Sequence, residues 1–320
     1  MINFWNNLPK AFTVLAPMDG ITDYVFRQMI LSFGKPDVFF TEFTPVDGML
    51  SKGSERVLLN LKCSKEELPI VAQIWGHNPS QFYKAAKIIS KLGFSGIDIN
   101  MGCPDRVSMK NGSCGALIKN PILAQEVIEA TKKGSGNIPV SVKTRIGFES
   151  ENIESWISFL LKQNLPALTI HLRTVSELSR VPAHWELMSK IIQLRDTINP
   201  KTLIIGNGDI NSLEEVKDKY KKFRCDGFMI GRGILANPWV FNKKIKLEQI
   251  EVKTKLDTYL KHIDIFTKTW GKEKNAAIIR KFCKVYINNF PKAAIFRERL
   301  METKTAEELK EKIIEYKKTI

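Results

Sequence analysis

Residues 96–104 read Gly-Ile-Asp-Ile-Asn-Met-Gly-Cys-Pro, a short β-rich segment that runs directly into a loop. A helical pattern follows, and the same order of strand, loop and helix recurs along the first 245 residues. The strand candidates are apolar on both faces, which is typical of parallel strands covered on two sides. They are Phe12–Pro17, Asp37–Phe43, Pro69–Trp75, Gly96–Asn100, Pro139–Arg145, Ala167–His171, Thr202–Gly206 and Asp226–Gly231.

A helical pattern follows each strand candidate, at roughly 22–33, 54–63, 79–92, 121–133, 151–164, 183–197, 212–222 and 234–244. Several begin with residues that favour a helix start: Thr22, Asn78-Pro79, Asn120-Pro121 and Asn211-Ser212. Eight strand–helix units over about 240 residues have the count and length of a (β/α)₈ TIM barrel, so we predict this α/β fold. A doubly wound open sheet is the alternative, although it would not need eight evenly spaced units.

A small all-helical domain is predicted from residue 246 onward. Glycines and β-branched runs become scarce, and residues 276–290 carry a helical stripe of apolar residues at 279, 282, 283, 286 and 290. Residues 246–320 hold 18 Lys and Arg against 11 Asp and Glu, a net charge of +7. We therefore expect a barrel over residues 1–245 and a basic helical domain over 246–320. The alternative is a helical extension that only packs under the barrel.

The whole chain of 320 residues is strongly basic, with 49 Lys and Arg against 34 Asp and Glu and a net charge of +15. This excess favours a polyanionic partner, either a nucleic acid or a membrane surface, because phosphates attract basic proteins. The alternative is that lysine only keeps the surface soluble. No segment concentrates the basic residues into a tail, so we expect them on folded surface.

The cysteine pattern favours a reducing compartment. Five cysteines, at 63, 103, 114, 225 and 283, are an odd number, and none forms a CxxC pair. This argues against a disulfide framework and a zinc ribbon and favours a cytoplasmic protein. We predict no metal and no membrane partner, and we take a monomer as the default state.

Polar residues follow nearly every predicted strand, at the end where a barrel keeps its chemistry. The glycine-rich turns after the last two strands, Gly206–Asp209 and Gly231–Gly233, lie where barrels usually bind phosphate, and Arg232 would add a charged contact. The strand ends carry Ala16-Pro17-Met18, Glu42, Gln73, Asn100–Cys103, Lys143-Thr144-Arg145, His171, Asn207-Gly208-Asp209 and Gly231-Arg232-Gly233. We predict an active site on this face.

Three of these side chains suit a ring cofactor. Lys143 interrupts an apolar strand, so it forms either a structural salt bridge or a contact with a cofactor that becomes anionic during turnover. The amide of Gln73 offers both a donor and an acceptor, as the edge of a flavin or pyrimidine requires. His171 offers a donor to a flavin carbonyl or phosphate.

Cys103 lies at the predicted barrel mouth, at the start of a long loop over residues 101–120. It is a candidate nucleophile or proton donor. No His is adjacent in sequence to activate it, so we favour proton donation. The glycines of the loop indicate a segment that can move as a lid, and Cys114 is the competing thiol.

These motifs resemble, in order, those of the tRNA-dihydrouridine synthase family. They cover most of residues 14–241 and are specific in combination, although each piece alone is weak. Two departures stand out: Phe282 replaces the histidine of the family's Arg-Lys-His helix, at Arg280-Lys281, and the loop after Cys103 aligns only loosely. The matching segments are Ala16–Asp23, Asn100–Pro104, Val142–Arg145, Leu168–His171, Asn207–Ile210, Met229–Gly233 and Pro238-Trp239.

The resemblance implies a barrel that binds FMN, with NADPH or NADH as electron donor, and a helical domain that binds tRNA. Cys103 would be the proton donor. The flavin-binding residues implied are Pro17, Met18, Gln73, Lys143, His171, Asn207, Gly208, Asp209, Gly231 and Arg232. The RNA-binding residues expected are Asn100, Arg145, Arg180, Arg280, Lys281 and Lys284.

The implied reaction is the reduction of tRNA uridines to 5,6-dihydrouridine, with a hydride delivered to C6 of uracil and a proton from Cys103 delivered to C5. Lys143 would stabilise the anionic reduced flavin, and the uridine would leave the RNA stack to be reached. Two alternatives stay open. One is a dihydroorotate dehydrogenase-like barrel acting on a free pyrimidine, which has no need of the basic helical domain. The other is a non-catalytic RNA-binding protein, which has no need of Cys103.

Overall fold

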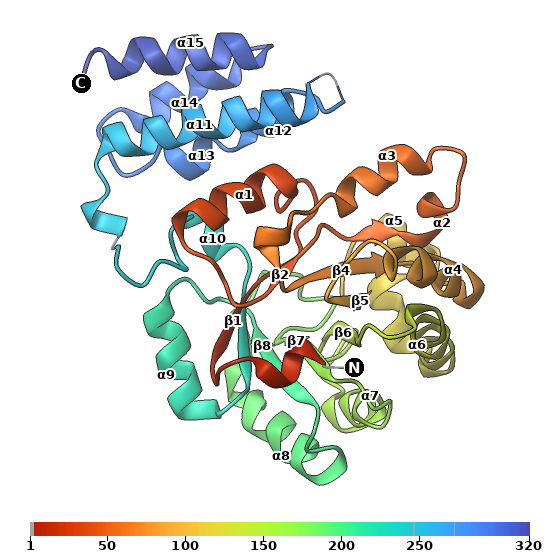
Figure 1. Cartoon of the computed structure of the whole chain (residues 1–320). Helices are drawn as coiled ribbons and strands as arrows, with labels where there is room; N and C mark the ends of the chain where they lie inside the picture. Colours follow the sequence, from red (N-terminus) through yellow and green to blue (C-terminus); the bar gives the residue numbers. More distant parts are fainter. Residues whose placement is uncertain (1–2, 246, 272) are drawn as a thin grey trace. The chain divides into compact units, whose positions relative to one another are not determined.

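A computed structural model describes residues 3–245, 247–271 and 273–320. The chain forms two compact units (Figure 1). The first unit comprises the chain up to Tyr24 together with Pro36–Gly231, and the second comprises Val25–Lys35 together with Arg232–Ile320. Lys246, at which we expected the helical domain to begin, lies outside the described residues.

The first unit contains a parallel β-barrel. Its strands follow the order β1-β9-β8-β7-β6-β5-β4-β2, and the short β3 pairs with β4. A parallel bridge between Val14 and Val38 connects β1 to the segment before β2 and closes the ring. The strands are β1 (Phe12–Leu15), β2 (Phe39–Phe40), β3 (Thr44–Pro45), β4 (Ile70–Trp75), β5 (Gly96–Met101), β6 (Val140–Arg145), β7 (Ala167–His171), β8 (Leu203–Asn207) and β9 (Gly227–Ile230).

The predicted eight-stranded TIM barrel is confirmed, with one difference in the second strand. The predicted strand over residues 37–43 is paired regularly only at Phe39 and Phe40. After these residues, the hydroxyls of Thr41 and Thr44 both donate to the carbonyl of Glu42, at 2.8 and 3.5 Å. Such local side-chain bonds compete with a sheet ladder, and the strand ends there.

Helices surround the barrel, and three of the expected start signals are confirmed. The side chains of Asn78, Asn120 and Ser212 accept hydrogen bonds from backbone N–H groups in the first turns of α4, α6 and α9. The helices of this unit are η1 (Phe4–Asn7), α2 (Val46–Met49), α3 (Ser54–Leu58), η2 (Leu59–Leu61), η3 (Lys65–Glu67), α4 (Pro79–Ile89), α5 (Arg106–Lys110), η4 (Cys114–Lys119), α6 (Pro121–Ser135), the π-helix η5 (Ile153–Ile157), α7 (Ser158–Leu161), η6 (Trp185–Leu187), α8 (Met188–Ile198) and α9 (Leu213–Phe223).

An apolar cluster fills much of the barrel interior and fixes which side chains point inward. Phe12 and Val14 of β1, Val71 of β4 and Ile205 of β8 belong to one buried cluster, although they come from distant parts of the chain. Side chains two residues apart on a strand share a face. Gln73 therefore points into the same interior as Val71, one layer closer to the carboxyl-terminal ends of the strands.

The second unit is helical. The helix expected over residues 234–244 is much shorter in the structure: α10 ends at Ala236, because the residue before Pro238 disfavours a helical backbone. The stripe at 279, 282, 283 and 286 is buried, as predicted, with Phe290 partly buried, but it is divided between α12 and α13, with Phe282 in the turn between them. The helices are α1 (Tyr24–Phe33), α10 (Gly233–Ala236), η7 (Leu247–Gln249), α11 (Val252–Trp270), α12 (Ala277–Lys281), α13 (Cys283–Tyr286), α14 (Ala293–Met301) and α15 (Ala306–Lys317).

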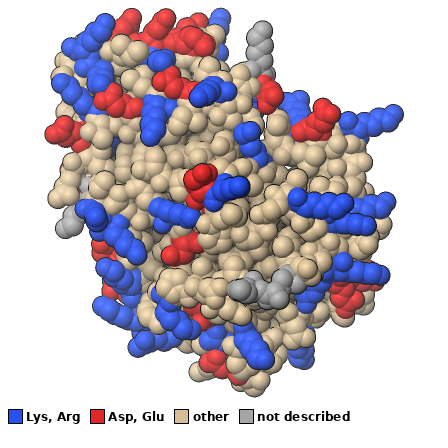
Figure 2. All heavy atoms as spheres, viewed as in Figure 1, with Lys and Arg blue, Asp and Glu red and all other residues tan. Residues whose placement is uncertain are grey.

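Basic side chains are spread over folded surface, as expected from their distribution in the sequence. Figure 2 shows Lys and Arg across the visible face, with Asp and Glu between them. Within the described residues, no helix combines the length and the apolar character needed to span a bilayer.

Candidate active site

Polar side chains enter the barrel interior from the middle of β4, β5 and β6 and from nearer their carboxyl-terminal ends. The strand register sets their level: Gln73 lies opposite Asp98, which lies opposite Ser141. Two residues further along the strands, Asn100 lies opposite Lys143. The parallel pairing therefore stacks two polar layers on the side of the barrel that leads to Cys103.

A continuous chain of hydrogen bonds connects these layers. Ser141 Oγ and Gln73 Nε2 donate to the two carboxylate oxygens of Asp98, at 2.6 and 2.8 Å. Asn100 Nδ2 donates to Gln73 Oε1 at 3.1 Å. Asn100 Oδ1 then accepts from the backbone N–H groups of Gly102 and Cys103, at 3.1 and 2.9 Å. The side chains of Asp98, Gln73 and Asn100 are buried.

Lys143 is a buried cation in this interior, on the layer above Asp98. Among the described residues, no hydrogen bond or ion pair engages its ammonium. Burial and, to a smaller extent, the neighbouring Arg145 cation lower the pKa of Lys143 to about 8, against the opposing effect of Asp98 and Cys103. An ammonium held in this way is available to a negative charge at the barrel mouth. The alternative of a structural salt bridge does not hold within the described residues.

Cys103 follows β5 and is half-buried. A hydrogen bond with the thiol of Cys114 is the main cause that lowers the pKa of Cys103, to about 7, while burial opposes it. Cys114 is fully buried, and the bond to Cys103 together with burial raises the pKa of Cys114 far above its ordinary value. Cys103 is therefore the thiol that can exchange a proton near neutral pH.

The loop after Cys103 is folded rather than open. Asp105 caps α5 by accepting from the backbone N–H and the hydroxyl of Ser108, both at 2.9 Å. Gly115 N donates to the carbonyl of Cys103 at 3.1 Å, and a side chain at Gly115 would lie 3.0 Å from that carbonyl. The glycine that we read as a sign of mobility is thus required for a close backbone approach.

Arg145 is buried and binds backbone carbonyls from two loops. Its Nε donates to Gly102 at 2.8 Å, and its Nη1 donates to Thr174 and Leu178, both at 2.8 Å. The side chain therefore fixes the loop that carries Cys103 to the loop after β7. Its expected contact with the target nucleotide stays a prediction.

Arg173 connects the ends of β7 and β8, and it is only 2% exposed. Its Nη1 lies 3.0 Å from Nε2 of His171, its Nη2 forms an ion pair with Asp209, and its Nε donates to the carbonyl of Val181 at 2.7 Å. Asp209 also accepts from the backbone N–H of Ala183 at 2.9 Å. Two predicted cofactor-binding residues, His171 and Asp209, are thus held by one guanidinium.

The glycine turns after β8 and β9 differ in the space around them: Gly208 lies in a close approach, whereas an added side chain at Gly231 would meet only ordinary contacts. Gly208 has φ of +127°, and a side chain there would lie 2.7 Å from the Cβ of Ala183. At Gly231 the nearest atoms to an added Cβ would be the Cβ of Ala16, at 3.5 Å, and the sulfur of Met18, at 3.9 Å. Asn207 Nδ2 donates to the carbonyl of Met229 at 2.8 Å, which joins the two strand ends.

The segment after β1 forms a tight turn. The backbone N–H of Met18 donates to the hydroxyl of Thr22 at 2.8 Å, and that hydroxyl donates back to the Met18 carbonyl at 3.1 Å. Thr22 was expected to start a helix, and it instead closes this turn. Pro17 is buried and Met18 is partly buried against the barrel core.

Comparison with known proteins decides the family. The model of the dihydrouridine synthase (Dus) family matches residues 14–320. The chain belongs to the dihydrouridine synthase family. It is 41% identical over 317 residues to a "Probable tRNA-dihydrouridine synthase" of Staphylococcus aureus (strain MRSA252), covering 98% of this chain and 95% of that protein. It is also 41% identical over 312 residues to a "Probable tRNA-dihydrouridine synthase 2" of Bacillus subtilis (strain 168), covering 96% and 94%. The resemblance stated from the motifs is confirmed.

Solved structures agree on the fold of this dihydrouridine synthase family member. A histamine dehydrogenase from Rhizobium sp. 4-9 is similar with a TM-score of 0.53 at 14% identity, covering 79% of this chain and 48% of that one. A variant of NCR from Zymomonas mobilis is similar with a TM-score of 0.51 at 16% identity, covering 77% and 95%. At this identity the likeness concerns the fold alone.

Three residues of the site were missed by sequence reasoning: Asp98, Ser141 and Arg173. Asp98 and Ser141 lie inside apolar strands, as Lys143 does. The argument that singled out Lys143, that a polar residue in a buried strand needs a partner, applies equally to them and would have identified both. Arg173 lies two residues after His171, just beyond its strand. Its contact with Asp209 spans 36 residues and depends on the closure of the barrel.

The remaining predicted RNA-binding residues differ in accessibility. Arg180 of the barrel unit and Lys281 and Lys284 of the second unit are exposed. Arg280 is half-buried, and its Nη1 donates to the carbonyl of Thr303 in the same unit. Arg232, also exposed, directly follows Gly231 and begins the main segment of the second unit. Their roles stay predictions.

Phe282, which replaces the family's histidine, is part of the core of the second unit. It is 4% exposed, and its ring packs 4.8 Å from that of Phe26 and 4.7 Å from that of His262. His262 is itself buried, and the hydroxyl of Tyr286 lies 3.1 Å from its Nδ1. The substitution is therefore accommodated by apolar and aromatic packing.

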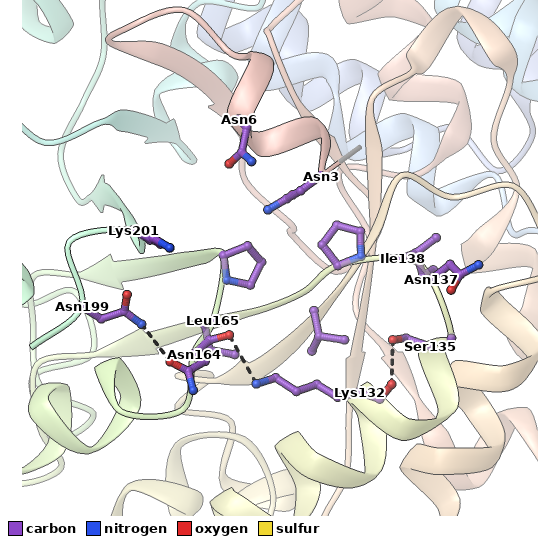
Figure 3. A pocket seen from close by; sticks show the side chains of 14 residues that line it. Asn3, Asn6, Lys132, Ser135, Asn137, Ile138, Asn164, Leu165, Asn199 and Lys201 are labelled. Atoms are coloured by element: carbon purple, nitrogen blue, oxygen red, sulfur yellow. Dashed lines mark hydrogen bonds between the residues drawn. The ribbon is translucent and has the colours of Figure 1, made fainter. Parts of the chain in front are cut away.

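A separate hollow of about 720 Å³ lies at the amino-terminal ends of β6, β7 and β8 (Figure 3). It is lined by asparagines and two lysines, including Asn164, Asn199 and Lys132. Lys132 is engaged with the carbonyls of Gln163 and Asn164. The hollow is at the opposite end of the strands from Cys103, the end that serves stability in such barrels.

Proposed function

We propose that this protein reduces uridines in tRNA to 5,6-dihydrouridine, using FMN as cofactor and NADPH as electron donor, in the cytoplasm. The observation that carries the proposal is the pairing of two groups at one barrel mouth. Lys143 offers an ammonium that no described protein group engages, and Cys103 offers a thiol with a pKa near neutrality. A reduction that places a hydride on one carbon and a proton on its neighbour requires an electrostatic partner and an acid of this kind.

The residues present fit a flavin. Gly208 and Gly231 leave their turns without side chains, and the Cβ of Ala16 and the sulfur of Met18 are the atoms nearest to where a side chain of Gly231 would begin. Lys143 supplies a positive charge, and Gln73 and His171 supply polar atoms on the facing strands. We assign the flavin-binding role to Pro17, Met18, Gln73, Lys143, His171, Asn207, Gly208, Asp209, Gly231 and Arg232.

The flavin, when bound and reduced, supplies the hydride for C6 of uracil. The Lys143 ammonium stabilises the negative charge of the reduced ring, because burial weakens its screening by water. Cys103 donates the proton to C5, and Asn100 Oδ1 holds the start of its loop in place by accepting from the backbone N–H groups of Gly102 and Cys103. Asn100 and Arg145 would contact the target uridine.

The second unit would bind the rest of the tRNA. Residues 246–320 carry the net charge of +7, and Lys281 and Lys284 are exposed on neighbouring short helices. Salt-dependent contacts with phosphates account for such an excess. Arg180, on the exposed loop after β7, is a further candidate contact on the barrel itself.

The direct test is to incubate the purified protein with NADPH and unmodified tRNA, digest the RNA and measure dihydrouridine by mass. A parallel reaction with orotate in place of tRNA tests the alternative of a free pyrimidine. Product from tRNA alone supports the proposal. Turnover of orotate without RNA, or no product from either, would overturn it.

The cofactor assignment has its own test. The purified protein should be yellow and should release FMN on denaturation. Lys143→Met should keep the fold and weaken flavin binding, since it removes the charge while keeping a side chain of similar length. Protein that is colourless and takes up no added FMN would contradict the assignment.

A further inference from the structure

Asp98 is a buried acid with no assigned part in the reaction. It is fully buried on β5, below Asn100, and both carboxylate oxygens are occupied by Ser141 Oγ and Gln73 Nε2. Burial raises the pKa of Asp98 to about 6, while its hydrogen bonds and Lys143 oppose this shift. At neutral pH the group is mostly a carboxylate.

The hydrogen-bond chain above Asp98 has a direction. Each amide along it, first Gln73 and then Asn100, uses its nitrogen toward Asp98 and its oxygen toward Cys103. A side-chain amide can turn over and exchange the positions of its donor and acceptor. A carboxylate can only accept, so it permits a single orientation of Gln73, and that orientation in turn fixes Asn100.

We propose that Asp98 is a positioning residue, whose carboxylate orients Gln73 and, through Gln73 and Asn100, holds the backbone of Gly102 and Cys103. It does not touch the substrate. Its effect passes along three side chains to the loop that carries the proton donor. The role assigned to Cys103 rests on the proposed function, whereas the structural coupling does not.

The cost of burying the Asp98 carboxylate supports this role. Its pKa in the folded protein is raised above the ordinary value of 3.8. Because the pKa of Asp98 is higher in the folded protein, its protonated form favours folding at low pH. That contribution is lost as the pH rises through about 6, so the carboxylate lowers the stability of the fold at neutral pH. A group kept only for packing would be better replaced by an apolar side chain of the same size.

Hydrogen exchange of the Gly102 and Cys103 amides tests the coupling directly. Pro104 has no amide, so in peptides over residues 100–105 only the amides of Met101 and Asp105 add to the signal of these two groups, and NMR resolves all four. Asp98→Leu removes the acceptor at similar volume and should raise the exchange of both amides about tenfold, the effect of one lost hydrogen bond. Asp98→Asn can either accept from Gln73 or donate to it, so it permits two orientations of the Gln73 amide, one of them the native one. This variant should give an intermediate rise in exchange.

A matched control separates coupling from general destabilisation. Asp226 is also a buried acid, bound by Arg195 Nη1 at 2.7 Å and by the backbone of Ile204 at 2.9 Å, ahead of β9. Asp226→Asn should lower the melting temperature without changing exchange at Gly102 and Cys103. Equal exchange in Asp98→Leu and the unmodified protein would overturn the proposal.

Two further measurements complete the test. If Asp98→Leu does not fold, Gln73→Met removes the next member of the chain and should raise the exchange of the same amides; no rise would overturn the proposal. In the flavin-loaded enzyme, oxidation of the reduced flavin by tRNA should slow about tenfold in Asp98→Leu and recover in part in Asp98→Asn. If neither the unmodified protein nor any variant reacts with tRNA, the proposed function is wrong. The hydrogen-exchange result still decides the role of Asp98 in that case.

Discussion

The guanidinium of Arg173 lies 3.0 Å from Nε2 of His171. A guanidinium has only donors, so Nε2 must accept and the ring proton of His171 resides on Nδ1. The second arm of Arg173 binds Asp209, on the loop after the next strand. One buried cation therefore fixes the tautomer of a predicted flavin contact and the position of a predicted phosphate-loop residue.

Replacing Arg173 by alanine should weaken FMN binding about 10- to 100-fold, because it removes a charge-assisted bond that orients His171 and releases Asp209. Quenching of flavin fluorescence on titration measures this affinity. Arg195→Ala is the matched control, since Arg195 is buried and binds Asp226 away from the site. Unchanged affinity in Arg173→Ala, at comparable stability, would show that Arg173 only supports the fold.

Cys103→Ala should leave flavin binding and flavin reduction by NADPH intact and slow dihydrouridine formation by roughly 10²–10⁴-fold, the usual effect of losing a general acid. Stopped-flow absorbance separates the two half-reactions. Cys114→Ala should be far milder at neutral pH, because this thiol is buried and has a strongly raised pKa. Similar losses of activity in the two variants would mean that we have assigned the wrong thiol or the wrong role.

The reaction with tRNA should depend on pH through Cys103. Its pKa is lowered to about 7, and proton donation requires the protonated thiol. The rate should therefore be level below pH 7 and fall above it, toward tenfold for each further pH unit. Cys114→Ala removes the bond that lowers this pKa, so the decline should move toward 9, the ordinary value. A decline at the same pH in both proteins would mean that another group controls the rate.

Changing Lys281 and Lys284 together to alanine should reduce the salt slope of tRNA binding by about 2, since each phosphate contact contributes roughly 0.9. We exclude Arg280 from this variant because its guanidinium binds the Thr303 carbonyl and its loss would disturb the unit. Flavin content should not change.

The control for that variant changes Lys310 and Lys317, which form ion pairs with Asp264 and Asp257 on the same helical unit. Their replacement should leave the slope near that of the unmodified protein. An unchanged slope in the Lys281 and Lys284 variant would place the RNA contact on the barrel instead, around the exposed Arg180.

Much of the barrel could be predicted from the sequence because its signals are local. Strands such as 140–145 are apolar on both faces, and the capping residues Asn78, Asn120 and Ser212 act on the backbone within three residues. Cys103 and Lys143 were also found locally, as polar groups at the ends of such strands. The folded loop after Cys103 was missed, because its short helices depend on Asp105 and on the contact of Gly115 with the Cys103 carbonyl.

The amino-acid sequence by itself determined the eight strand–helix units, the excess of positive charge and the residue types at the strand ends, because each follows from short-range pattern and composition. Only the tertiary structure decided that Asp98 orients Gln73, that Arg173 joins His171 to Asp209, and that the Cys114 thiol tunes Cys103. These partners are between 2 and 36 residues apart in sequence. The strand register and the folded loop bring them to hydrogen-bond distance, and hydrogen bonds act only at that range.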